Sequence, residues 1–331
     1  MISLKTNLLF SILLVVCGCA AQKSNSITAD PISGVSVDSK ENNYAHVIRE
    51  QGYKRYLAGE FTRAINHFEA YLVLDPKGED QWIKYLLYYC YMAVGEYERA
   101  LTLAKDLVHE KPYDFLSYQQ IGLAQLWLGK LGDAIKNFQR SLEFESHLPQ
   151  ALFYQGLAYG QARQFDKQEA VFKDAENEYA QVLKSNPADF KSNYEMANLY
   201  LYWNKEVEKV PALISAAKGS LTSRLADEDV LREESVYLNF HIPLLEGIYL
   251  YRTEKYQKSL HLLLAALVNA PTGTVADLSE LYYYMGANYL ALEDPVRARS
   301  FLEKANRLDP RGMYAEVTRK MLRGISPKKS E

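Results

Sequence analysis

Small residues and prolines recur at fixed intervals along most of this chain. Gly52, Ala64 and Pro76 follow one another at intervals of 12 residues. The same intervals recur, complete or in part, at Ala100–Pro112, Gly122–Ala134, Gly247–Pro271 and Gly286–Ala298–Pro310. Self-similarity of this kind indicates stacked supersecondary units, each in contact with its neighbours, in place of a single core.

The spaced residues suit pairs of packed helices. A glycine in the first helix of a pair lets the second helix approach closely, with a small residue such as Ala64 opposite it. Phe68, Phe138 and Leu302 each follow an alanine by four residues, on the same helix face, and are predicted to fill the space between the helices. The prolines end the second helix, because the residue before a proline avoids the α region. One pair cannot bury both of its faces, so the units must stack.

This pattern resembles the tetratricopeptide repeat (TPR), a helix-turn-helix unit of about 34 residues, over most of residues 45–312. Alignment on the spaced residues gives about seven units, which start at Ala45, Gln81, Phe115, Pro149, Phe190, Phe240 and Ser279. The first, second, third and seventh units match well, the sixth matches less well, and the fourth and fifth are degenerate. The resemblance implies an all-α fold, an α-solenoid that winds as a right-handed superhelix and ends in a C-terminal cap helix.

Irregular intervals mark the predicted boundaries. The second helix of the fourth unit is predicted from about Phe165 to Lys184, and Pro211 lies where the second helix of the fifth unit should continue. The predicted organisation is TPR-like units one to five in 44–203, with the degenerate fifth continuing to about 222, an irregular helical insertion in 204–239, units six and seven in 240–312, and a cap helix with a tail in 313–331.

The first residues have the pattern of an export signal. Lys5 precedes a mainly apolar segment from Leu8 to Val16. A helix needs about 20 residues to span a bilayer, so this segment is too short to be a membrane span. It fits the hydrophobic region of a secretory signal peptide, which we predict to cover residues 1–18.

The next residues decide how such a signal is removed. Val16-Cys17-Gly18-Cys19 resembles a bacterial lipobox, in which an aliphatic residue, a free position and a glycine precede a cysteine. The resemblance implies that the Cys19 thiol is acylated and that Cys19 becomes the new N-terminus. Ordinary cleavage after Ala21 is the alternative. Two or three acyl chains anchor a protein stably, because each buried CH₂ contributes about 0.8 kcal/mol.

The segment after the lipobox supports the same interpretation. Residues 19–43 are poor in core-forming side chains and are predicted to be the lipidated cysteine and a disordered tether. Ala20 follows the cysteine, where an Asp would favour retention at the inner membrane. We therefore expect a lipid-anchored protein of the bacterial cell envelope, on the periplasmic face of the outer membrane.

Composition and motifs give no support for catalysis. The net charge of −3 and pI near 6.1 argue against a nucleic-acid partner. The six His lie far apart, and there is no phosphate-binding loop, nucleophile elbow or metalloprotease motif. Cys90 lies alone between two tyrosines, which favours a buried structural thiol over a reactive one. We expect no enzyme activity, no catalytic residues, no metal and no cofactor.

Tyrosine is concentrated in the predicted first helices. The first-helix segments of the seven units together contain 18 of the 26 Tyr. In proteins of the TPR family the first helices line the concave face of the superhelix, so the resemblance implies an aromatic groove. The predicted partner-binding residues are Tyr53, Tyr56, Trp82, Tyr85, Tyr89, Trp127, Phe153, Tyr194, Tyr202, Tyr251 and Tyr283. Such rings offer apolar area and polar atoms at little cost in rotamer entropy.

Two interpretations of these rings remain open. They line a binding groove, or they pack between adjacent units. The tyrosines predicted to pack are Tyr88, Tyr91, Tyr159, Tyr200 and Tyr289.

The predicted function is that of a scaffold. TPR lipoproteins serve in β-barrel insertion, in pilus or secretion assembly and in peptidoglycan machinery, so the resemblance implies protein partners in an envelope complex and membrane attachment through N-terminal acyl chains. The alternative is a lipoprotein that binds a glycan or small ligand in the same groove. Sugar sites usually combine rings with clustered Asp, Asn and Arg, in which the predicted groove is poor.

Overall fold

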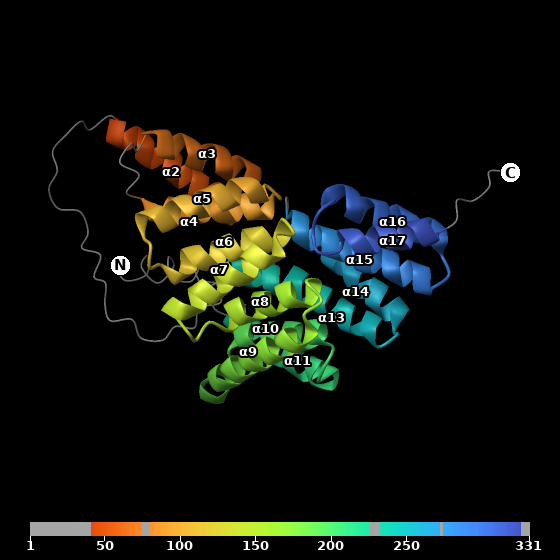
Figure 1. Ribbon diagram of the computed structural model, residues 1–331. Helices are drawn as coiled ribbons and strands as arrows, with labels where there is room; N and C mark the ends of the chain where they lie inside the picture. The colour runs from red at the N-terminus through yellow and green to blue at the C-terminus, as the bar shows by residue number, and fades with distance from the viewer. Residues whose placement is uncertain (1–40, 75–79, 226–231, 272–273, 326–331) are drawn as a thin grey trace.

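The computed structural model describes residues 41–74, 80–225, 232–271 and 274–325, and every regular element in these ranges is helical (Figure 1). No helix within these ranges is both long and apolar enough to cross a membrane. The predicted signal peptide, Cys19 and nearly all of the tether lie outside the described residues.

Within the described ranges the helices form seven successive pairs. Each helix packs mainly on its neighbours in sequence. The pairs are α2 (Glu41–Leu57) with α3 (Phe61–Leu74), α4 (Gln81–Ala93) with α5 (Tyr97–Glu110), α6 (Phe115–Trp127) with α7 (Leu131–Phe144), α8 (Pro149–Gln161) with α9 (Phe165–Ser185), α10 (Phe190–Trp203) with α11 (Val210–Leu225), α13 (Ile242–Arg252) with α14 (Tyr256–Val268), and α15 (Val275–Ala291) with α16 (Pro295–Leu308). Helix α17 (Ala315–Gly324) follows the last pair. The predicted fold class, an all-α solenoid of TPR-like units, is confirmed.

Aspartate caps set the starts of several first helices. The side chains of Asp80, Asp114 and Asp189 each accept a hydrogen bond from a backbone N–H in the first turn, of α4, α6 and α10 respectively. A cap of this kind satisfies a donor that has no partner inside the helix. These helices begin at Gln81, Phe115 and Phe190, the residues at which the repeat alignment starts its units.

Large side chains fill the space that the first-helix glycines leave. A Cβ atom built on Gly156 would lie 2.3 Å from the Phe172 ring. Similar close approaches occur at Gly52–Phe68, Gly122–Phe138, Gly247–Leu263 and Gly286–Leu302. The nearest neighbour of each glycine is thus the Phe or Leu of the second helix, and at Gly286 the backbone oxygen of Ala298, the predicted small residue, also lies opposite, 3.2 Å from the Cβ position. In the second unit the sizes are exchanged, with Tyr88 and Ala104 at these positions, and both are fully buried.

The region between the fifth and sixth pairs contains both regular and irregular helix. Pro211 lies in the first turn of α11, where proline is well tolerated. Helix α11 packs on α10 as the second helix of this pair. A short 3₁₀ turn, η1 (Val207–Lys209), precedes it. Further on, α12 (Arg232–Val236) continues through a π-helical turn, η2 (Tyr237–His241), directly into α13.

The array curves until its last unit meets its second unit (Figure 1). The Tyr97 hydroxyl, at the start of α5, donates a hydrogen bond to Asp309 Oδ2 at the end of α16, at 3.3 Å. Both side chains are buried, and burial raises the pKa of the Asp309 carboxyl. Beside this bond, Val275 at the start of α15 packs against Gly95, 3.1 Å from the position of a Cβ there. We call this contact the closing contact.

Candidate functional site

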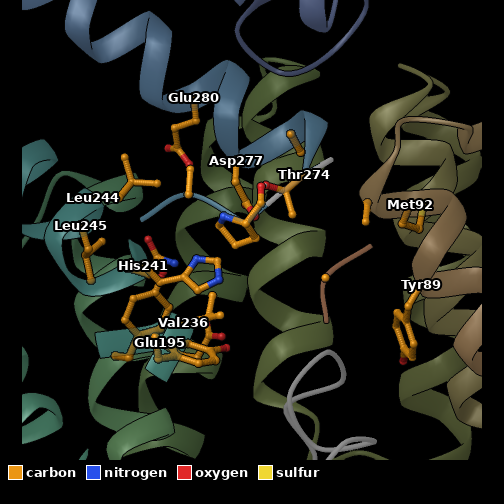
Figure 2. Close-up of a pocket in the computed structure, with 18 of the residues that line it drawn as sticks. Tyr89, Met92, Glu195, Val236, His241, Leu244, Leu245, Thr274, Asp277 and Glu280 are labelled. Carbon is orange, nitrogen blue, oxygen red and sulfur yellow. The ribbon is translucent and has the colours of Figure 1, made fainter. Parts of the chain in front are cut away.

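A cavity of about 630 Å³ lies between the first helices of the N-terminal units and the elements of the C-terminal part (Figure 2). Its walls come mainly from α2, α4, α6, α8 and α10, with Phe61 of α3, on one side and from α12, η2, α13 and α15 on the other. The closing contact brings these two sides together. Six of the eleven predicted groove residues line it, namely Tyr56, Tyr89, Trp127, Phe153, Tyr194 and Tyr202.

The other five predicted groove residues are not among the residues that line this cavity. Tyr85 donates a hydrogen bond to Asp114 Oδ2 at 2.9 Å, and Tyr283 stacks on Tyr314 with ring centroids 4.6 Å apart. Tyr251 packs edge-on against Tyr284 at 5.5 Å. Tyr53 and Trp82 pack, partly buried, on the core of the first units. The structure therefore gathers about half of the predicted set into one site.

The tyrosines predicted to pack between units are removed from solvent. All five are buried, and they are Tyr88, Tyr91, Tyr159, Tyr200 and Tyr289. Cys90 is buried in the same cluster as Tyr88 and Tyr91, and burial raises the pKa of its thiol, as expected for a structural cysteine. Among the residues that the structure describes, no three His, Cys, Asp or Glu side chains are placed to hold a metal ion.

Aromatic rings make up much of the cavity wall. Ten of the lining residues are aromatic, and they are Tyr56, Phe61, Tyr89, Trp127, Phe153, Tyr154, Tyr194, Tyr202, Tyr237 and Tyr314. Many of these rings support one another. Phe153 meets Tyr202 edge-on at 5.7 Å, and Tyr194 meets Tyr237 in the same way at 5.2 Å. Edge-to-face contacts of this kind hold rings in fixed orientations, so the wall presents preformed aromatic surfaces.

Three carboxyl groups face the same space, and sequence reasoning missed them. Glu195 comes from α10, and Asp277 and Glu280 come from α15. Figure 2 shows Asp277 and Glu280 extending from α15 toward the side where His241 lies, with Tyr89 and Met92 on the opposite wall. No lysine or arginine is among the lining residues that the structure describes. The available signal was the single charge of Glu195 inside the otherwise uncharged run Ser192–Leu201.

Burial controls the protonation of these groups. Glu280 Oε1 accepts hydrogen bonds from the Tyr202 hydroxyl at 2.7 Å and from the Tyr314 hydroxyl at 2.5 Å. Desolvation nevertheless raises the pKa of Glu280, and it raises the pKa of Glu195 to about 7. Desolvation lowers the pKa of His241, so this imidazole is neutral at pH 7. The cavity therefore carries negative charge that grows as the pH rises.

The buried Glu195 carboxyl should make stability depend on pH. Its pKa lies above the usual value of 4.5, so the folded chain holds this proton more tightly than the unfolded chain. The resulting stabilisation is complete below about pH 4.5 and is lost as the pH rises through about 7. Glu195→Gln should therefore be more stable than the natural chain at about pH 8, by on the order of 3 kcal/mol, and equally stable at about pH 4. Urea unfolding of both proteins at several pH values measures this; a pH-independent difference would contradict it.

Of three comparisons with known proteins, the one with solved structures supports the fold. No family model matches the sequence, and no curated protein matches it. Among solved structures, the chain is similar to one in the crystal structure of the APC/C hetero-tetramer Cut9-Hcn1, at 13% identity and a TM-score of 0.51, over 87% of this chain and 52% of that chain. The chain thus spans about half the length of that relative.

Two solved TPR proteins have lower TM-scores. One from Parabacteroides merdae has 15% identity and a TM-score of 0.45 over 85% of this chain and 98% of that chain. One from Thermus thermophilus has 16% identity and a TM-score of 0.42 over 63% of this chain and 98% of that chain. The helix pairs, the repeat spacing and the likeness to the first of the three structures define the class of the fold, a TPR-type helical solenoid.

Proposed function

We propose that this protein is a non-enzymatic scaffold that holds a segment of a partner protein in its central cavity. The observation that carries this proposal is the preformed aromatic wall on the inner side of the solenoid. Large, oriented rings bury much area without losing rotamer freedom, which is why Tyr and Trp dominate the energetically important parts of protein interfaces. The stacked helix pairs behind the wall keep the rings in place.

The cellular location of this scaffold is proposed from its N-terminal sequence. The lipobox-like Val16–Cys19 supports acylation at Cys19, and the predicted tether, residues 19–43, would join this anchor to the helical body. We therefore propose a lipid-anchored scaffold on the periplasmic face of the outer membrane, with partners in a pilus, secretion, β-barrel or peptidoglycan assembly.

Trp127→Ala tests the scaffold. Trp127 lines the cavity and stacks on Tyr97 with ring centroids 6.1 Å apart. Proteins crosslinked to the chain in living cells are purified from membranes and quantified by mass spectrometry. We expect recovery of the main partner to fall by about tenfold or more, as for a central interface aromatic. Trp203→Ala is the control, because Trp203 lies outside the cavity lining and donates its indole N–H to Glu169. Failure to recover any specific partner with the natural chain would contradict the proposed scaffold function.

A second candidate is a glycan-binding or small-ligand-binding lipoprotein. Asn198, Asn239 and Asp277 stand among the rings, so the cavity is richer in polar partners than the groove predicted from the sequence. Its volume also lies within the range of about 300–1,000 Å³ that is common for small-ligand sites. Two results together would favour this candidate: the natural chain binds a glycan on an array and Trp127→Ala does not, and the crosslinking experiment recovers no protein partner.

A further inference from the structure

We propose that the cavity selects a positively charged side chain, a lysine or arginine carried by the partner segment. This inference rests on the proposed function, because it names the chemistry of the segment that the cavity takes. It depends on three features of the described residues: the carboxyl groups of the lining, the absence of lysine and arginine from it, and the way this chain pairs cations with rings elsewhere.

The charge of the lining has one sign. Glu195, Asp277 and Glu280 face the cavity from two different helices; no described lining residue is a lysine or arginine, and the one lining histidine, His241, has a pKa lowered by burial. Two cations act electrostatically on these carboxyl groups, Lys191 on Glu195 and Arg252 on Glu280. Neither lines the cavity. In a partly desolvated space a carboxylate attracts a cation far more strongly than it does in water, so the lining favours a positive ligand.

The outer surface of the same chain shows how such a ligand would be held. Arg99 lies over the Tyr91 ring, 4.3 Å from its centroid, and pairs with Glu69. Two further groups repeat this combination of a cation, a ring and a carboxylate, and they are Arg297 with Tyr289 and Asp294, and Lys205 with Trp203 and Glu169. A cation over a ring beside a carboxylate gains from both contacts.

The cavity contains two of these three components. Glu280 is held by the hydroxyls of Tyr202 and Tyr314, which lie 2.9 Å from each other. The Tyr314 ring also packs against Tyr283 and Tyr284 and is fixed in orientation. Arg252 acts on Glu280 and on Tyr284, but it is not among the lining residues, so a cation inside the cavity has to be supplied by a ligand. A flexible lysine or arginine side chain has the length to reach a recessed carboxylate while its backbone stays nearer the surface.

The experiment compares peptides that differ only in charge. The full chain in detergent is titrated at about pH 8, where Glu195 is mainly ionised, into fluorescein-labelled nine-residue peptides of glycine and serine. Their two central residues are lysine, norleucine or glutamate. Fluorescence anisotropy gives the dissociation constants. We expect the lysine peptide to bind about tenfold more tightly than the norleucine peptide, and the glutamate peptide to bind most weakly.

Matched variants locate the effect. Glu280→Gln and Glu195→Gln keep the side-chain shape and remove the charge, and each should reduce the preference for lysine over norleucine by about fivefold or more. Glu169→Gln is the control, because Glu169 pairs with Lys205 on the outer surface, and it should leave the preference unchanged. Circular dichroism confirms that each variant is folded.

The outcomes separate this inference from the proposed function. Equal binding of the lysine and norleucine peptides, or an unchanged lysine preference in both cavity variants, would overturn charge selection and leave the scaffold intact. Binding of 1,5-diaminopentane in competition assays without binding of any peptide would instead assign the cavity to a free amine. That result would remove the protein segment as its occupant, and with it the proposed function.

Discussion

Gly156→Leu is expected to lower the free energy of unfolding by about 3 kcal/mol or more, the upper part of the range for overpacking a tightly packed core. Even a Cβ atom at this position would lie 2.3 Å from the Phe172 ring, which is fully buried and has no room to retreat. Urea unfolding followed by circular dichroism measures the change. Gly132→Leu is the matched control: Gly132 is an exposed helical glycine with nothing within 4 Å of its Cβ position, so leucine there should stabilise α7 slightly.

The same contact makes a rescue possible. The second unit already has the large residue on its first helix and alanine on its second, as Tyr88 and Ala104. Adding Phe172→Ala to Gly156→Leu copies that exchange and should restore most of the lost stability. Phe172→Ala alone should destabilise the chain by about 3–5 kcal/mol through the cavity that it leaves. Additive losses in the double variant would contradict the proposed size exchange.

Cys19→Ser is expected to abolish lipid attachment completely. A serine hydroxyl does not form the thioether through which a lipobox cysteine is acylated, so cells grown with radioactive palmitate should yield an unlabelled protein. Without acyl chains the protein should also leave the membrane fraction, because the anchor contributes about 0.8 kcal/mol for each buried CH₂. Labelling and fractionation of the natural and variant chains measure both effects.

The other two cysteines of the chain provide the controls. Cys17 occupies the free position of the lipobox-like sequence, and Cys90 is buried in the core of the second unit. Cys17→Ser and Cys90→Ser should therefore retain full labelling. Persistent labelling of Cys19→Ser, or its loss in Cys17→Ser, would refute acylation at Cys19.

Local pattern explains why much of the fold was predictable. Aspartates before Gln81, Phe115 and Phe190 and the spaced small residues specify where helices begin and which faces meet. The fourth unit was interpreted as degenerate, although Gly156 and Phe172 are spaced like the glycine and large residue of the regular units. The unusual length of α9 (Phe165–Ser185) hides this packing pair in the sequence.

The candidate site was harder to predict because it depends on distant parts of the chain. Tyr56 and Tyr202 belong to different units, and only the curvature of the whole array places them around one cavity. The acidic groups were overlooked since carboxylates on helical repeats are usually solvated. Whether Glu280 faces water or Tyr314 is decided by how α15 sits after the array closes, which no short sequence window reports.

The closing contact has a consequence for the order of folding. Tyr97 and Asp309 are 212 positions apart, whereas most other contacts join adjacent units. Helix pairs of a solenoid can form one after another as the chain emerges, because each needs only its neighbour. The cavity cannot form until the last pair is present, so it is the most non-local and slowest part of the structure to assemble. A chain interrupted before α15 would be mostly folded and would still lack this cavity.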